Sequence, residues 1–204
     1  MYKVAIVGHS QVPVDLPEIP YVELKIFRKP GAKLEHVHES PLGDVFNYRP
    51  DLCIVLMGGN DIGIPQADRA EVMGRLRAYL LELKEITPDL RWMNMEKRFY
   101  PWRNRYGVNN QQYEVDRKWF NNAMRGFLRT NQIQPLNVTG PWWAGNQIDG
   151  VHFNQEASRA IRRKLLNCIL QVVTHMRRFP DGTVSDRLTQ PDPPVVAGQK
   201  RRRK

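Results

Sequence analysis

A serine near the start of the chain and an acidic turn near its end contain the residue types needed for acyl transfer. Ser10 ends the triplet Gly8-His9-Ser10, and two residues separate Asp149 from His152 in Asp149-Gly150-Val151-His152. A serine hydroxyl is a weak nucleophile and needs a base to take its proton. Histidine titrates near neutral pH, and a nearby carboxylate can fix its tautomer and stabilise the imidazolium. Ser10, His152 and Asp149 are therefore candidates for nucleophile, general base and orienting acid.

Acyl transfer also needs hydrogen-bond donors for the negative charge that develops on the carbonyl oxygen. Gly31, and Asn60 within Gly58-Gly59-Asn60-Asp61, follow predicted strands and can supply such donors. We predict that the backbone amides of Ser10 and Gly31 and the side-chain amide of Asn60 form this oxyanion hole. Each donor of this kind is typically worth about 10²–10³ in rate.

Each block also has a purely structural interpretation. Ser10 and Asp61 can cap helices, Gly31 after Pro30 can belong to a plain turn, and His152 can lie on the surface of a turn. The blocks are more informative together, because they occur in order and at one predicted edge of the fold. Their combination favours a hydrolase site.

The elements around these blocks predict a three-layer α/β fold. Short apolar runs typical of buried parallel strands lie at 4–7, 22–27, 52–57, 90–95 and 133–138. Apolar residues recur at helical spacing in 72–86, 113–128 and 157–176. Such alternation implies a parallel sheet with helices on both faces. The polar blocks then meet at the carboxyl edge of the sheet, where ligands bind in this class of fold.

The blocks resemble those of the SGNH hydrolases, also called GDSL-type esterases. That family supplies a serine, a glycine, an asparagine and a histidine in this chain order, and the matching residues here are Ser10, Gly31, Asn60 and His152. The resemblance extends over about residues 2–176. It implies a flavodoxin-like fold with a five-stranded sheet and a serine esterase that hydrolyses short-chain, acetyl-type carboxylic esters through an acyl-serine intermediate. It implies no cofactor and no metal.

One position departs from that family's pattern, because His9 stands where the family usually has an aspartate before the serine. Gly-His-Ser variants look similar to SGNH-like domains carried by animal mobile elements. This implies an alternative function, as a catalytically weak or inactive module that binds nucleic acid or a protein partner. The α/β-hydrolases fit less well, because their Gly-x-Ser-x-Gly elbow needs a second glycine and Ser10 is followed by Gln11-Val12.

Composition indicates an ordinary globular domain with excess positive charge. Only two of the 204 residues are cysteines, Cys53 and Cys168, and both lie in apolar runs, so we expect buried thiols rather than a disulfide or zinc site. No run is long enough for a membrane helix, and the first residues do not resemble a signal peptide. We therefore expect an intracellular protein, either cytoplasmic or nuclear.

Basic residues account for a net charge of +10 and concentrate in two segments. We expect a domain at 1–179 and a disordered basic tail at 180–204, which is rich in proline. A tail of this kind can bind nucleic acid weakly through its last five residues, which are Lys200, Arg201, Arg202, Arg203 and Lys204.

Aromatic residues near the predicted site have two interpretations. Residues 97–106 interleave them with basic residues, and we interpret this segment as a packed lid, with nucleic-acid contact as the alternative. Trp142 and Trp143 precede Asp149 and are candidates for substrate-binding residues, or for partly buried loop anchors.

Overall fold

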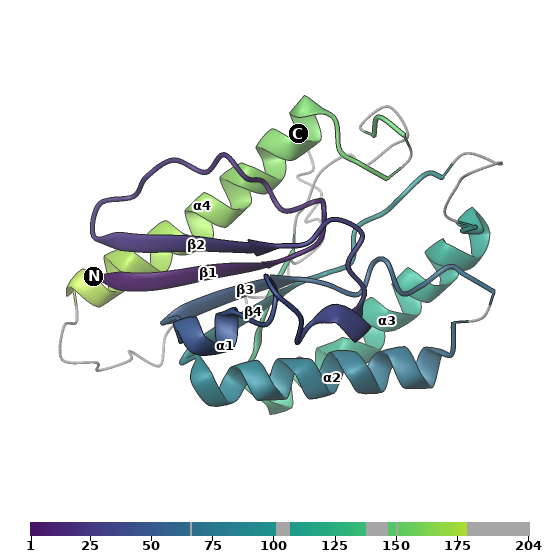
Figure 1. Cartoon of the computed structure of the whole chain (residues 1–204), viewed down its shortest axis with the longest axis horizontal. Helices are drawn as coiled ribbons and strands as arrows, with labels where there is room; N and C mark the ends of the chain where they lie inside the picture. Colours follow the sequence, from purple (N-terminus) through teal and green to yellow (C-terminus); the bar gives the residue numbers. More distant parts are fainter. Residues whose placement is uncertain (66, 101–106, 138–146, 150, 179–204) are drawn as a thin grey trace, which may run out of the picture.

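The computed structural model describes residues 1–65, 67–100, 107–137, 147–149 and 151–178. Five strands form one sheet in the order β2-β1-β3-β4-β5, and every neighbouring pair is parallel (Figure 1). The strands are β1 (Tyr2–Gly8), β2 (Val22–Arg28), β3 (Leu52–Leu56), β4 (Asp89–Met93) and β5 (Gln134–Leu136). This is the flavodoxin-like order. The predicted α/β fold with five parallel strands is confirmed.

The central strand β3 shows why these apolar runs form a sheet. All five of its residues are buried, and successive side chains point to opposite faces. Leu52, Ile54 and Leu56 belong to one core cluster. Cys53 and Val55 belong to the other. A strand that is buried on both faces therefore needs a continuous apolar sequence rather than an alternating one.

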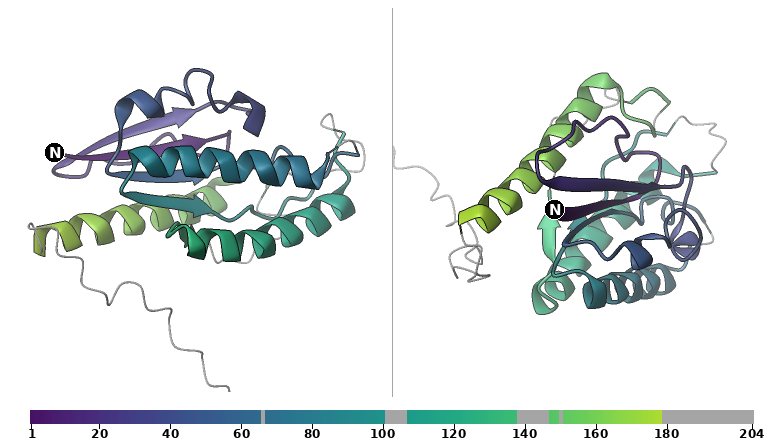
Figure 2. Two further views of the ribbon diagram at one scale, coloured as in Figure 1. Left: turned by 90° about the horizontal axis from the view of Figure 1, so that it is seen from below. Right: turned by 60° about the vertical axis from the view of Figure 1, so that its left-hand side comes forward.

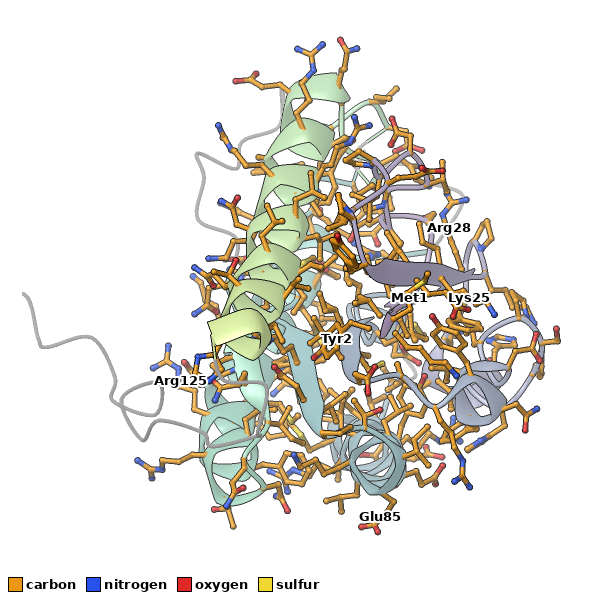
Figure 3. The ribbon with its side chains drawn as sticks, turned by 90° about the vertical axis from the view of Figure 1, so that its left-hand side faces the viewer. Met1, Tyr2, Lys25, Arg28, Glu85 and Arg125 are labelled. Atoms are coloured by element: carbon orange, nitrogen blue, oxygen red, sulfur yellow. The ribbon has the colours of Figure 1, made fainter. Side chains whose placement is uncertain are left out.

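Helices cover both faces of the sheet. Figures 2 and 3 show α4 (Gln155–Arg178) on the side opposite α2 (Arg69–Ile86), and α3 (Asn110–Thr130) contributes to the same core cluster as α2. The short elements η1 (Leu34–His36) and α1 (Val45–Tyr48) also add residues to that cluster. The three layers expected from the sequence are therefore present.

A buried carboxylate links α3 to the loop that precedes α2. Asp116 is only 2% exposed. It accepts hydrogen bonds from Gly63 N at 3.1 Å, from Arg69 Nε at 2.6 Å and from Gln112 Nε2 at 2.8 Å. These bonds compensate the cost of burying a charge, so the loop after β3 is held between the two helices.

The largest departure from the predicted elements is at the edge of the sheet. We predicted a strand over 133–138, but β5 spans only Gln134–Leu136. Pro135 lies in its middle and has no N–H to donate, which is tolerated in an edge strand but limits its length. At the carboxyl end, α4 stops at Arg178, and the predicted tail, including Lys200 to Lys204, lies outside the described residues. No helix within the described ranges has the length and apolar character needed to cross a membrane.

Candidate active site

Ser10, Asp149 and His152 lie together at the carboxyl edge of the sheet. His152 Nε2 is 3.1 Å from Ser10 Oγ, and His152 Nδ1 is 2.8 Å from Asp149 Oδ2. All three side chains are partly exposed. A proton can therefore pass directly from the hydroxyl to the imidazole while the carboxylate faces the other ring nitrogen.

The Asp149 carboxylate also builds the turn that carries His152. Its Oδ1 accepts hydrogen bonds from Val151 N at 3.0 Å and His152 N at 2.8 Å, while its Oδ2 faces the ring. Partial burial opposes ionisation, but hydrogen bonds from the His152 backbone and ring and from Val151 outweigh it and lower the pKa of Asp149 to about 2. The carboxylate is therefore ionised throughout the neutral range.

Two side chains that the sequence analysis missed hold Ser10 in place. Gln11 Nε2 donates to Val151 O at 2.9 Å, which joins the serine loop to the Asp149–His152 turn. Arg28, at the end of β2, donates from Nη2 to Ser10 O at 3.0 Å. Neither residue belongs to a recognisable motif, and the only signal was position, since Arg28 ends β2 and Gln11 lies in the loop after β1.

Gly31 lies in a tight turn beside the serine block. Ala32 N donates to Lys29 O at 3.1 Å, and Lys29 N donates to Gly8 O at 3.1 Å. Gly31 has φ +73°, a left-handed value expected at the third position of a Pro-Gly type II turn. The turn interpretation therefore holds locally, and it places Gly31 next to the first block.

Asn60 connects to the same turn through its side chain. Its Nδ2 donates to Ala32 O at 2.8 Å, and its Oδ1 accepts from Arg98 Nη1 at 2.9 Å. The interpretation of Asp61 as a helix cap is wrong. It is buried, accepts from Leu34 N at 2.9 Å, and burial raises its pKa to about 6. Asp68 caps α2 instead, by accepting from Ala70 N and Glu71 N.

The sequence profile of the GDSL-like lipase/acylhydrolase family matches residues 18–160, which is more than half of the chain. The chain belongs to this family. As a GDSL-type protein, it is a carboxylic ester hydrolase. No curated protein sequence is significantly similar to it.

Solved structures of GDSL-type and related esterases share the fold. An acetyl xylan esterase, AlAXEase, is 15% identical with a TM-score of 0.60, and the match covers 82% of this chain and all of that one. A lipase/acylhydrolase from Enterococcus faecalis is 16% identical with a TM-score of 0.61, and the match covers 83% of this chain and 95% of that one. A carbohydrate esterase family 3 protein from Talaromyces cellulolyticus is 16% identical with a TM-score of 0.59, and the match covers 86% of this chain and 99% of that one. At these identities the likeness establishes the fold alone.

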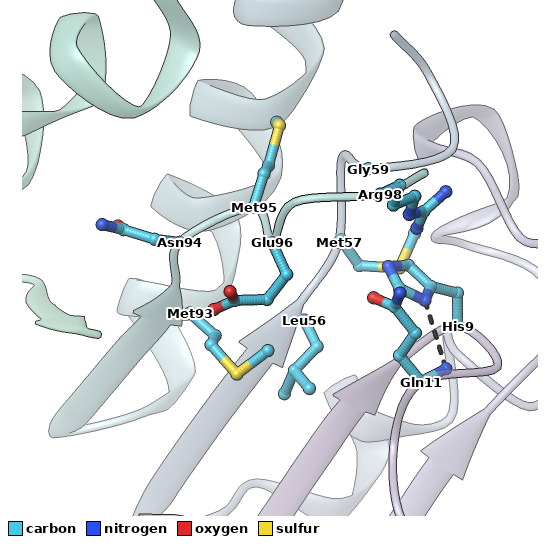
Figure 4. Close-up of a pocket in the computed structure, with 10 residues that line it drawn as sticks. All are labelled: His9, Gln11, Leu56, Met57, Gly59, Met93, Asn94, Met95, Glu96 and Arg98. Carbon is cyan, nitrogen blue, oxygen red and sulfur yellow. Dashed lines mark hydrogen bonds between the residues drawn. The ribbon is translucent and has the colours of Figure 1, made fainter. Parts of the chain in front are cut away.

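His9, the departure from the GDSL pattern, points into the protein. It is buried, and burial together with the nearby Arg98 guanidinium lowers its pKa well below the ordinary value, so the ring is neutral at physiological pH. His9, Gln11, Glu96 and Arg98 line a small cavity beyond the ends of β3 and β4 (Figure 4). The cavity has room for about one water molecule, which is too little for an acyl chain.

The described part of the 97–106 segment agrees with a packed lid. Arg98 and Tyr100 are each 4% exposed, so neither offers a surface to a nucleic acid. Residues 101–106, and the predicted substrate residues Trp142 and Trp143, lie outside the described residues. Within the described ranges, no group of three or more His, Cys, Asp or Glu side chains is arranged to hold a metal ion.

The buried Glu96 should make stability depend on pH. Burial raises its pKa from 4.5 to about 8, against an opposing effect of Arg117. Between these values the unfolded chain is ionised at this residue and the folded chain is not, so stability falls as pH rises. We expect Glu96→Gln to unfold like the wild type near pH 4.5 but to be more stable at pH 8, by on the order of 3 kcal/mol.

Urea denaturation at a series of pH values measures this difference. Glu85→Gln, on the exposed side of α2, is the matched control and should follow the wild type throughout. Parallel pH profiles for the wild type and Glu96→Gln would show that Glu96 ionises normally in the folded protein.

Proposed function

We propose that this hydrolase cleaves short-chain, acetyl-type carboxylic esters through an acyl-Ser10 intermediate. The observation that carries the proposal is the continuous hydrogen-bonded path from Ser10 Oγ through His152 to Asp149. In this path the imidazole lies between the hydroxyl and the carboxylate, so one ring nitrogen can accept the Ser10 proton while the other faces Asp149. Family membership supports the reaction class.

In the first half-reaction, His152 Nε2 takes the proton from Ser10 Oγ as the oxygen attacks the ester carbonyl carbon. The tetrahedral intermediate collapses when His152 returns this proton to the alcohol oxygen, and the alcohol leaves. In the second half-reaction, water attacks the acyl group, His152 takes its proton, and the proton returns to Ser10 as the acid departs. Asp149 stays ionised because its pKa is about 2, and its negative charge stabilises the imidazolium.

We assign the oxyanion hole to the backbone amides of Ser10 and Gly31 and the Asn60 side chain. Hydrogen bonds from Lys29 to Gly8 and from Asn60 to Ala32 support this assignment, because they bring the three blocks side by side. Asn60 Nδ2 carries two hydrogens and uses one on Ala32 O, which leaves the other for the substrate.

The structural neighbours favour an ester substrate that carries a short acyl group such as acetyl. They include an acetyl xylan esterase and a mutant acetyl esterase whose crystal structure was solved with acetate ion. A panel of p-nitrophenyl acetate, butyrate and octanoate tests the proposal. We expect the highest kcat/KM for acetate and only a small residual turnover for Ser10→Ala. Equal rates for octanoate and acetate would contradict the acyl-chain preference, and wild-type activity in Ser10→Ala would contradict the mechanism.

Loss of the Asn60 amide should slow the chemical step selectively. We expect Asn60→Ala to lower kcat about 10²–10³-fold with little change in KM, because the oxyanion forms only in the transition state. Asn131→Ala is the control, since the Asn131 side chain donates to Phe127 O at the end of α3. Steady-state kinetics on p-nitrophenyl acetate measure both. A rise in KM at constant kcat would place Asn60 in ground-state binding instead.

The alternative function, a nucleic-acid-binding module, has little support among the described residues. Its basic terminal run lies outside them, and Arg98 of the other basic segment is buried against Asn60 and Tyr100. The esterase is therefore the function we propose.

A further inference from the structure

We propose that Arg98 is a positioning residue of the oxyanion hole, which fixes the orientation of the Asn60 side-chain amide. The inference rests on the proposed function, because that function gives Asn60 its role as a donor. Arg98 follows β4 and belongs to none of the four blocks that carry the predicted acyl-transfer residues. Its side chain nevertheless donates hydrogen bonds to Asn60 and Tyr100 and lies over the Tyr113 ring.

The Asn60 side-chain amide has an acceptor and a donor that each face a matching partner. Arg98 Nη1 donates to Oδ1 at 2.9 Å, while Nδ2 donates to Ala32 O at 2.8 Å. If the amide turned over, two donors would face each other at Arg98 and two acceptors would face each other at Ala32. Arg98 therefore makes only one orientation favourable, and that orientation keeps an N–H available for the oxyanion.

Arg98 is itself held in place by buried neighbours. The residue is 4% exposed, and Nη1 also donates to the Tyr100 hydroxyl at 2.7 Å. The guanidinium carbon lies 5.5 Å from the centre of the Tyr113 ring. A side chain with fixed partners on several sides can hold Asn60 without losing entropy at each turnover.

Gly59 supplies an independent observation. A Cβ atom at this position would lie 2.8 Å from Arg98 Nη2, inside the distance that real Cβ contacts keep. The guanidinium therefore packs directly against the backbone that precedes Asn60. A residue with a Cβ at position 59 would have to displace this guanidinium, so the glycine leaves the space that Arg98 occupies beside Asn60.

The charge of Arg98 adds to this effect. Within the described residues, no carboxylate lies at ion-pair distance from it, and the neighbouring His9 is neutral. Asp61 interacts with its charge from farther away, and a buried cation that donates to an amide oxygen polarises that amide. The positive charge therefore strengthens the donor that Arg98 orients.

A double-mutant cycle tests whether Arg98 acts through Asn60. We expect Arg98→Met to lower kcat for p-nitrophenyl acetate about 10–100-fold with KM nearly unchanged, and Arg98→Lys to recover part of the loss. In an Asn60→Ala background, Arg98→Met should have no further effect, because its target is absent. Arg91→Met is the control, since Arg91 is a partly buried arginine paired with Asp89.

The outcomes separate this inference from the proposed function. Additive losses in the cycle, or a KM effect alone, would overturn the positioning role even if Ser10 proves to be the nucleophile. If the wild type shows no hydrolysis that depends on Ser10, the proposed function fails, and NMR of the Asn60 side-chain amide decides the positioning role. We expect its hydrogens, assigned by their loss in Asn60→Ala, to exchange at least about tenfold faster in Arg98→Met and to be intermediate in Arg98→Lys. Unchanged exchange in both variants would overturn the inference.

Discussion

Replacing Ser10 or His152 by alanine is expected to remove nearly all ester hydrolysis, and replacing both should cost no more than replacing one. The hydroxyl and the imidazole are 3.1 Å apart and act on the same proton, so neither has a function without the other. In other serine hydrolases, such losses reach about 10⁶-fold in kcat and are strongly non-additive. The residual rate should come from the oxyanion hole and substrate binding, which do not depend on the nucleophile.

Single-turnover kinetics and mass spectrometry of the acylated protein measure this result. The wild type should show an acyl adduct on Ser10, and Ser10→Ala should show none. Ser40→Ala and His38→Ala are matched controls, because both residues are exposed. Ser40 contacts Asp44 on the surface, and His38 contacts Glu82. Losses that multiply in the double variant would mean that Ser10 and His152 act in separate steps.

Replacing Asp149 by asparagine should cost about 10³–10⁴ in kcat, because an amide can donate to His152 Nδ1 and stabilise the wrong tautomer. The amide oxygen of the introduced side chain can still accept the hydrogen bonds from Val151 N and His152 N, so the turn should keep its shape. The variant therefore removes the charge and the ring contact while keeping the local geometry. Because the pKa of Asp149 is about 2, the wild type should not lose this carboxylate's charge anywhere near neutral pH.

Measurement of kcat from mildly acidic to alkaline pH tests this role. Asp68→Asn is the control, because asparagine caps a helix about as well as aspartate does. Activity of Asp149→Asn within a few-fold of the wild type would show that the imidazole needs no carboxylate. A loss of folded signal by circular dichroism would instead show that the carboxylate is required for the turn.

The sheet was predictable from sequence because its central strands are buried on both faces. Such strands need runs of apolar residues, and β1 and β3 are recognised by these runs alone. At the edge this signal weakens, since only Leu136 of β5 is buried and the chain supplies a proline beside it. The predicted strand was therefore longer than the observed one.

The residues of the candidate site also differ in how easily the sequence reveals them. Residues that act by chemical type, such as Ser10 and His152, stand out in a sequence because few other residues can replace them. Gln11 and Arg98 do not, because their roles depend on hydrogen-bond partners that lie 140 and 38 positions away. The basic and aromatic neighbours of Arg98 predicted a packed lid, but nothing local indicated its contact with Asn60.

The contacts of His152 differ greatly in sequence separation. Its contact with Asp149 spans three positions, whereas its contact with Ser10 spans 142. The acid–base pair can form within a short stretch of chain at almost no cost in loop closure, but pairing with the nucleophile must wait until nearly the whole chain has folded. Recovery of esterase activity during refolding should therefore be among the last events, after the secondary structure has returned. Recovered activity then indicates that folding is complete.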